Sequence, residues 1–253
     1  MSVLSSITKP VDRPVIMTVL GEAGLGKTSL AATFPKPIFI RTEDGLQAIP
    51  EASRPDAFPM ADTVESLMEQ LGALVHEEHD YKTLVIDSVT QLETMFIQHI
   101  IENDPKKPKS INQAMGGYGA GMSAVAALHG RVRKAAKMLN DKGMHIVFIA
   151  HADTETIELP DQDPYMRYSL RLGKKSMSHY VDNVDLVGLV KLQMFLKGDD
   201  DKRKKAISTG QRVITATTSA SSVTKNRYGI TQDLPCELGV NPFINYIPSL
   251  TEQ

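Results

Sequence analysis

A glycine-rich turn followed by a lysine and a threonine is the segment with the clearest chemistry. Its residues match the pattern G-x-x-x-x-G-K-[ST] in full. In this pattern glycines let backbone N–H groups turn toward a phosphate, the lysine reaches the β- and γ-phosphates of a nucleotide, and the threonine hydroxyl coordinates Mg²⁺. We therefore predict ATP and Mg²⁺ as cofactors. The predicted nucleotide contacts are Gly21, Glu22, Ala23, Gly24, Leu25, Gly26, Lys27, Thr28 and Ser29.

A carboxylate further along the chain completes the predicted metal site. The apolar run 84–86 is followed by Asp87 and Ser88. Phosphoryl-transfer sites with this loop need an acid at such a strand end to hold the Mg²⁺ shell. Because parallel strands end at the same edge of a sheet, Asp87 can lie close to Thr28. An aspartate often merely starts a turn after a strand, but the glycine-rich loop upstream favours a metal ligand.

Alternating strands and helices must position these groups. Short apolar runs rich in β-branched residues predict buried strands, and apolar residues at helical spacing predict helices between them. Strands that are apolar throughout indicate a parallel sheet covered on both faces. The expected strands are 15–20, 37–41, 83–86 and 145–150, and the expected helices are 27–33, 64–78, 90–102 and 124–139.

The pattern changes after residue 182. Two longer apolar stretches, 184–196 and 212–218, flank a charged turn at 197–205, which is typical of a hairpin. We therefore predict an α/β fold with a mostly parallel central sheet flanked by helices and antiparallel strands near the C-terminus. Residues 1–13 are expected to form a flexible leader, and 14–253 a single domain.

Composition excludes several classes of protein. The 253 residues carry 28 Lys and Arg against 30 Asp and Glu, a net charge of −2, and 42% are hydrophobic. This excludes disorder of the whole chain and a chain-wide basic field, so any nucleic acid must bind to local patches. Cys236 is the one cysteine, which excludes an internal disulfide. No run approaches the roughly 18 apolar residues of a membrane span, and we expect a cytoplasmic location.

With these motifs, the chain resembles the RecA-like recombinase ATPases over about 15–230. It is most similar to short phage-encoded members that consist of the ATPase core alone. The resemblance implies DNA-stimulated ATP hydrolysis between neighbouring subunits of a filament or ring that binds single-stranded DNA. It also implies the cytoplasm of the phage host as location. The pattern shows no accessory domains. We therefore expect the protein to anneal DNA strands, or to mediate recombination, beside a separate annealing protein.

The resemblance assigns two catalytic roles near the nucleotide. In that family a glutamate after the second strand orients the attacking water, and here Glu43 stands at that position, with Asp44 as the rival. A polar residue at the end of a later strand senses the γ-phosphate. This chain has His151 where the family often has Gln or Asn. A histidine there can donate to a phosphate, or it can be purely structural.

A third correspondence is the segment Lys225-Asn226-Arg227. The recombinases carry a similar basic element that reaches the ATP of a neighbouring subunit. The resemblance therefore implies that Lys225 and Arg227 stabilise the transferring phosphoryl group across an interface. The alternative is a solvated basic turn.

The resemblance also implies that two loops, 103–122 and 153–178, contact DNA. Both combine cations with aromatic residues, and the first is rich in glycine. Such segments suit single-stranded nucleic acid, because cations follow the backbone and rings stack on bases. The alternative is two solvated loops. The predicted DNA contacts are Lys106, Lys107, Lys109, Tyr118, Arg167, Arg171, Lys174 and Lys175.

Other functions remain open from the sequence. One is a different ATPase with the same loop, such as an AAA-type helicase loader. Helicase loaders of this type usually end in a helical lid, and the strands expected after residue 184 argue against such a lid. Another is a nucleotide-gated DNA-binding module with little hydrolysis. A small-molecule kinase would need an arginine-rich lid, which the sequence does not show.

Overall fold

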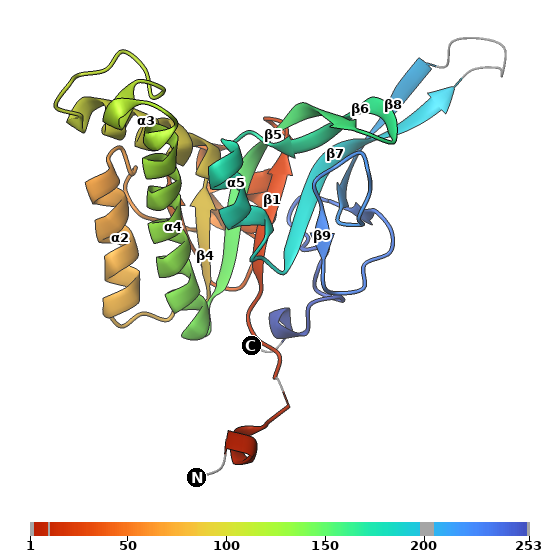
Figure 1. The fold of residues 1–253 in the computed structure, drawn as a ribbon. Helices are drawn as coiled ribbons and strands as arrows, with labels where there is room; N and C mark the ends of the chain where they lie inside the picture. Colours follow the sequence, from red (N-terminus) through yellow and green to blue (C-terminus); the bar gives the residue numbers. More distant parts are fainter. Residues whose placement is uncertain (1–2, 10, 198–204, 252–253) are drawn as a thin grey trace.

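The computed structural model describes residues 3–9, 11–197 and 205–251 (Figure 1). Its strands are β1 (Ile16–Gly21), β2 (Pro37–Arg41), β3 (Asp56–Ala57), β4 (Thr83–Asp87), β5 (His145–Leu159), β6 (Gln162–Leu170), β7 (Leu186–Lys197), β8 (Lys205–Thr215), β9 (Lys225–Asn226) and β10 (Leu234–Pro235). Its α-helices are α1 (Lys27–Ala31), α2 (Val64–His76), α3 (Val89–Asn103), α4 (Ala120–Asp141) and α5 (Lys174–Val181). Its short 3₁₀ helices are Val3–Ser6, Leu46–Ala48, Glu51–Ser53, Ala114–Gly116 and Pro248–Leu250.

One mostly parallel sheet forms the centre of the molecule. The order of its strands is β10-β8-β7-β1-β5-β4-β2-β3, and the strands from β7 to β3 run parallel. Beyond β7, β8 runs antiparallel to β7, and β10 runs antiparallel to β8. The predicted α/β fold with antiparallel strands toward the C-terminus is therefore confirmed.

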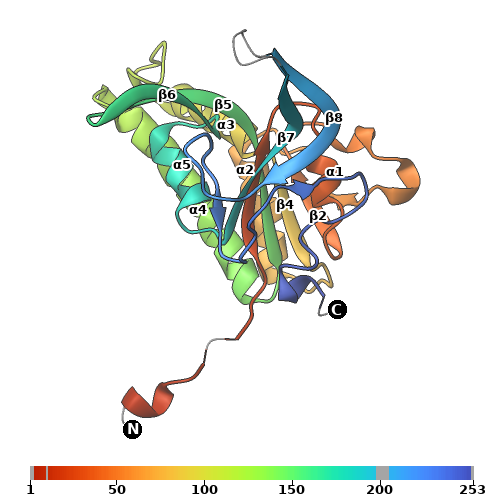
Figure 2. The same cartoon turned by 90° about the vertical axis from the view of Figure 1, so that its right-hand side faces the viewer.

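Two apolar layers cover the sheet, one on each face. Ile16 and Leu20 of β1 belong to the layer shared with α2, α3, α4 and α5. Met17 and Val19 belong to the other layer, which contains α1 and the C-terminal segment. Figure 2 shows α4 and α5 on one side of the strands and α1 on the other. Burial on both faces explains why β1 is apolar at nearly every position.

Several boundaries differ from those expected. The segment 153–178 is not a loop, because β5 continues to Leu159 and pairs with β6 as an antiparallel ribbon before α5 begins. This ribbon leaves the core, is mostly exposed and is dominated by polar residues, a composition close to that of a polar loop. α4 begins four residues before the expected start, at Ala120, and α1 ends at Ala31.

The C-terminal part is built from strands and turns. Among the described residues after β8, the structure has β9, β10 and one short 3₁₀ helix, and no α-helix forms a lid there. The expected strand 212–218 ends earlier, at Thr215, and its partner β7 begins at Leu186. Most of the charged turn expected between them, residues 198–204, lies outside the described residues.

The described part of the predicted leader, residues 3–9 and 11–13, is exposed, and 3–9 extend away from the sheet (Figure 1). Arg13, at the end of the leader, forms an ion pair of 2.8 Å with Asp185. A search of the described helices for one long and apolar enough to cross a bilayer finds none.

A buried histidine joins the amino ends of β1 and β5. The backbone N–H of Val15 donates to Nδ1 of His145 over 3.1 Å, and the His145 side chain packs edge-on against Phe34. Burial lowers the pKa of His145 from 6.5 to about 4. The folded protein therefore keeps this imidazole neutral in a pH range where the unfolded chain protonates it.

We expect His145 to make the protein acid-sensitive. Its folded pKa lies below its unfolded one, so its contribution to stability is complete above pH 6.5 and is lost as the pH falls toward 4. Between pH 7.5 and 4.5, the unfolding free energy of wild type should drop by about 2 kcal/mol relative to His145→Asn, which keeps an acceptor but cannot titrate. Urea unfolding at both pH values measures this difference. The exposed His76→Asn is the control, and an equal drop in wild type and His145→Asn would contradict the assignment.

Candidate functional site

The register of the parallel strands brings the predicted site residues to one edge of the sheet. Gly21, at the end of β1, pairs with His151 of β5. Asp87, at the end of β4, pairs with Arg41 of β2 and with Ile149 of β5. The carboxyl ends of these strands meet at the upper edge in Figure 1. Open parallel sheets bind their ligands at this edge.

The glycine-rich loop has the conformation that its sequence predicts. Gly24 and Gly26 have φ angles of 77° and 81°, in the left-handed region where a side chain would be strained. The ammonium group of Lys27 donates to the carbonyls of Gly21 and Glu22 over 2.9 and 2.8 Å. Burial lowers the pKa of Lys27, whose side chain is 6% exposed. The loop thus holds a cation and free backbone N–H groups against the space where a phosphate would lie.

Thr28 and Asp87, the two predicted metal ligands, contact each other. The Thr28 hydroxyl donates to Oδ2 of Asp87 over 2.7 Å, and Asp87 is only 2% exposed. Burial raises the pKa of Asp87 to about 6, which the hydrogen bond from Thr28 offsets in part. The nearby Lys27 charge also favours the charged carboxyl, but burial and the neighbouring Glu43 outweigh these effects and leave the pKa of Asp87 raised.

The space beside this pair is suited to a metal ion. A Cβ atom on Gly45 would lie 2.9 Å from Oγ1 of Thr28 and 3.2 Å from Oδ2 of Asp87, so only glycine keeps the space open. Among the described residues, no cluster of three or more His, Cys, Asp or Glu could hold a metal by itself. One carboxylate and one hydroxyl suit Mg²⁺, which takes its remaining ligands from phosphates and water.

Glu43 and His151 form the second polar pair of the site. His151 Nε2 lies 3.1 Å from Oε1 and 3.3 Å from Oε2 of Glu43. The hydrogen bond from His151 holds the pKa of Glu43 below its usual value, against the effect of burial. Glu43 is therefore charged at neutral pH and still reaches solvent, as a water-orienting carboxylate must. Its rival Asp44 instead contacts Gln47 and Arg41.

A cavity of about 610 Å³ collects these groups. Four of its lining residues, Gly45, Ala48, Arg212 and Leu238, were not predicted from the sequence. Gly45 could have been noticed as a glycine two residues after Glu43, but nothing local marks Arg212. It reaches the cavity only because β8 joins the sheet beside β7. The full lining is Ala23, Gly24, Gly26, Lys27, Thr28, Ser29, Glu43, Asp44, Gly45, Ala48, Asp87, His151, Arg212 and Leu238.

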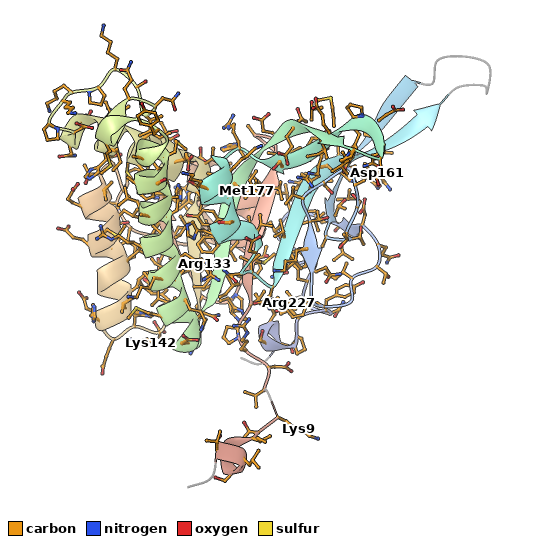
Figure 3. All side chains as sticks on the ribbon, viewed as in Figure 1. Lys9, Arg133, Lys142, Asp161, Met177 and Arg227 are labelled. Atoms are coloured by element: carbon orange, nitrogen blue, oxygen red, sulfur yellow. The ribbon has the colours of Figure 1, made fainter. Side chains whose placement is uncertain are left out.

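Lys225 and Arg227 lie away from this cavity. β9 pairs with the amino end of β7, where Leu186 faces Asn226, whereas the loop follows the opposite end of the neighbouring β1. Arg227 forms an ion pair of 2.9 Å with Asp185, and the Lys225 ammonium group donates to the carbonyls of Val181 and Asp182. Figure 3 shows Arg227 toward the lower end of the strands. Their action on a neighbouring subunit stays a prediction.

Some of the predicted DNA contacts lie close together although they come from separate segments. Lys106, Lys107, Lys109 and Tyr118 lie in the connection between α3 and α4. Tyr118 is fully exposed. Lys175, in the first turn of α5, donates to the Ser123 hydroxyl of α4 over 2.7 Å. It therefore joins the α5 region to the start of α4, directly after this connection.

The other cations predicted to contact DNA belong to β6, the turn after it and the first residue of α5. Arg167 is bound to Glu155 by an ion pair of 2.8 Å, so its charge is locally compensated. Arg171 and Lys174 line a second cavity of about 500 Å³ between α3, β5, β6 and α5. The backbone N–H of Arg171 donates to the carbonyl of His151 over 2.9 Å. A single backbone hydrogen bond therefore links Arg171, in the basic turn before α5, to His151, whose side chain lines the first cavity.

We expect removal of the Asp87 charge to stabilise the ligand-free protein. A carboxyl whose pKa rises on folding adds stability below its unfolded pKa, 3.8, and loses it as the pH rises to about 6. At pH 7.5, Asp87→Asn should therefore increase the unfolding free energy by roughly 1–3 kcal/mol, and at pH 4 the gain should nearly vanish.

Urea unfolding at the two pH values measures this effect. Asp44→Asn is the matched control, because Asp44 lines the same cavity but is exposed, and its effect should stay within about 0.5 kcal/mol. The same Asp87→Asn protein should gain less stability from Mg²⁺ plus nucleotide than wild type does. A destabilised Asp87→Asn at pH 7.5 would contradict the account of the buried charge.

Comparison with known proteins agrees with this geometry. No curated protein matches the chain. A family model described as an AAA domain matches residues 13–228, which include the glycine-rich loop, Glu43, Asp87 and His151. The glycine-rich loop, the buried acid and the parallel sheet are also those of a nucleotide site. Because the match covers most of the chain, the chain belongs to this AAA domain family of P-loop NTPases.

Proposed function

We propose that the protein is an ATP-dependent, single-stranded-DNA-binding recombinase core that hydrolyses ATP with Mg²⁺. The observation that carries the proposal is the hydrogen bond of 2.9 Å between the backbone of His151, in the nucleotide cavity, and that of Arg171, in the basic turn before α5. The two regions are adjacent, so a change at the nucleotide can reach a DNA-binding surface without a long path.

The residues of the first cavity have the chemistry that ATP hydrolysis needs. Lys27 is available to bind the β- and γ-phosphates, and the charged Glu43 can orient a water for in-line attack. Nε2 of His151 contacts the Glu43 carboxylate, and the same N–H could instead be donated to a γ-phosphate. Mg²⁺ held by Thr28 and Asp87 would neutralise charge on the phosphate oxygens.

Several contacts support a coupling between nucleotide and DNA. The backbone N–H of His151 donates to the Thr90 hydroxyl at the start of α3 over 2.9 Å. Thr90 lines the second cavity together with Arg171 and Lys174. A shift of His151 on loss of the γ-phosphate would therefore move α3 and the basic turn together. We propose that this movement changes the affinity for single-stranded DNA.

The charge of the proposed DNA surface is local. The chain is nearly neutral overall, whereas the connection before α4 carries Lys106, Lys107 and Lys109 and the fully exposed ring of Tyr118. Cations that follow a phosphate backbone and a ring that stacks on bases bind single strands without a sequence preference. Figure 1 shows this connection and the β5–β6 ribbon at the same upper edge of the molecule.

Assembly into a filament or ring is part of the proposal. Lys225 and Arg227 lie at the edge of the sheet opposite to their own nucleotide cavity, so they would act only on the ATP of another subunit. A partner protein that anneals or coats single strands would complement a core of this size. The chief alternative, an AAA-type helicase loader, is weakened by the absence of a helical lid from the described C-terminal residues.

Nucleotide turnover in the presence of DNA tests the proposal. We expect ATP hydrolysis by wild type to rise at least fivefold with single-stranded DNA and less with duplex DNA. Lys27→Ala should lower turnover by roughly 100-fold or more, because it removes the cation that stabilises the transferring phosphoryl group. The exposed Lys36→Ala, which loses only an ion pair with Asp80, is the control.

Single strands that neither bind nor change turnover would overturn the recombinase proposal. Stimulation by a helicase and not by DNA would favour the loader. DNA binding that depends on ATP, with turnover no higher in wild type than in Lys27→Ala, would favour a nucleotide-gated binding module.

The coupling role of His151 has its own test. His151→Ala removes the hydrogen bond to Glu43 but keeps the backbone bonds to Thr90 and Arg171. We expect it to reduce the ratio of DNA-stimulated to basal turnover by roughly fivefold or more, and His151→Gln, which can still donate, to restore most of that ratio. Full stimulation in His151→Ala would contradict the coupling.

A further inference from the structure

The nucleotide cavity has two chemically different ends. Glu43 follows β2, Asp87 ends β4 and His151 lies in β5, and these strands are on one side of β1 in the sheet. Arg212, from β8, and Leu238, which follows β10, line the cavity from the other side of β1. The first end carries the metal ligands and the water-orienting acid. The second end therefore faces the part of a nucleotide that does not react.

Arg212 lies directly on the glycine-rich loop. A Cβ atom on Gly26 would be 2.2 Å from Nη1 of Arg212, so the guanidinium occupies the space that this glycine leaves free. Its hydrogen bond to the Leu25 carbonyl is long, 3.4 Å. Within the described part of the chain, no carboxylate forms an ion pair with Arg212. A half-buried guanidinium with one weak neutral acceptor is left with donors and a flat face available to a ligand.

Leu238 supplies an apolar surface next to this cation. The backbone N–H of Cys236 donates to the Arg212 carbonyl over 2.9 Å, and β10 pairs with β8, so the segment before Leu238 is anchored to the strand of Arg212. The Leu238 side chain is 65% exposed although it lines the cavity. An exposed leucine beside a guanidinium fits a planar aromatic ring, which both groups can contact through its face.

We propose that Arg212 and Leu238 form the subsite for the base and ribose of the bound nucleotide, with the guanidinium against the face of the base. This inference rests on the proposed nucleotide-hydrolysing function and adds the residues that hold the nucleoside end. Since that end does not change in the reaction, the two side chains contribute the same binding energy to substrate, transition state and product.

The test compares nucleotides with a ligand that has no nucleoside. Dissociation constants are measured by calorimetry for ATP, ADP and inorganic tripolyphosphate, each with Mg²⁺, on wild type, Arg212→Ala, Arg212→Lys and Leu238→Ala. Arg212→Ala should weaken ATP and ADP equally, by roughly tenfold, and leave tripolyphosphate within about twofold of wild type. Leu238→Ala should show the same pattern with a smaller change, and in turnover the effect should fall on KM rather than on kcat.

The controls are a cation and an apolar residue nearby. Lys191→Ala removes a charge from β7 that is paired with Asp233, and Val240→Ala removes an exposed apolar side chain two residues after Leu238. Both should bind all three ligands as wild type does. Thermal unfolding of each variant checks that the fold is intact.

Three results would overturn the inference because they would assign Arg212 to the phosphates instead of the base. These are an equal loss of tripolyphosphate binding in Arg212→Ala, full recovery of affinity in Arg212→Lys, and a fall in kcat without a change in KM. Each would mean that the guanidinium acts on phosphate as a point charge. If wild type binds ATP and Arg212→Ala binds it with the same dissociation constant, only this inference is contradicted. If wild type binds no nucleotide, the proposed function itself is contradicted.

Discussion

The hydrogen bond between Thr28 and Asp87 is the contact on which the site depends. It joins the start of α1 to the end of β4 and buries a carboxyl that is unfavourable when charged. Two parallel strands must end at the same level to bring these groups together, and Gly45 must keep the adjacent space open. A protein selected for stability alone would not keep a poorly compensated acid there. A metal ion would supply the missing positive charge.

The Glu43–His151 pair extends this arrangement away from the phosphate loop. Its hydrogen bond fixes the charged form of Glu43, while the backbone of His151 is bonded to α3 and to the turn before α5. His151 therefore lines the first cavity with its side chain and is bonded through its backbone to Thr90 and Arg171, which line the second cavity. If the protein couples nucleotide state to DNA, His151 provides one direct connection, because it is bonded to Glu43, Thr90 and Arg171.

Local patterns in the sequence were enough to predict that the glycine-rich loop, Asp87 and His151 meet at one edge of the sheet. The loop from Gly21 to Thr28 is a contiguous motif, and Asp87 and His151 each follow a buried apolar run, so their positions at the sheet edge follow from the parallel fold. Arg212 could not be found in this way, because its place depends on the antiparallel pairing of β8 beyond β7 and on the path of the chain over Gly26. Likewise, the β5–β6 ribbon was mistaken for a loop, since exposed two-stranded ribbons bury little and leave no apolar signature.

The central claim is that the nucleotide state sets the affinity for single-stranded DNA. Fluorescence anisotropy of a labelled oligonucleotide, with Mg²⁺ and either a non-hydrolysable ATP analogue or ADP at fixed salt concentration, measures it most directly. The account predicts at least fivefold tighter binding with the ATP analogue, and affinity in both states that falls as salt is raised. Equal affinity in the two nucleotide states would contradict it.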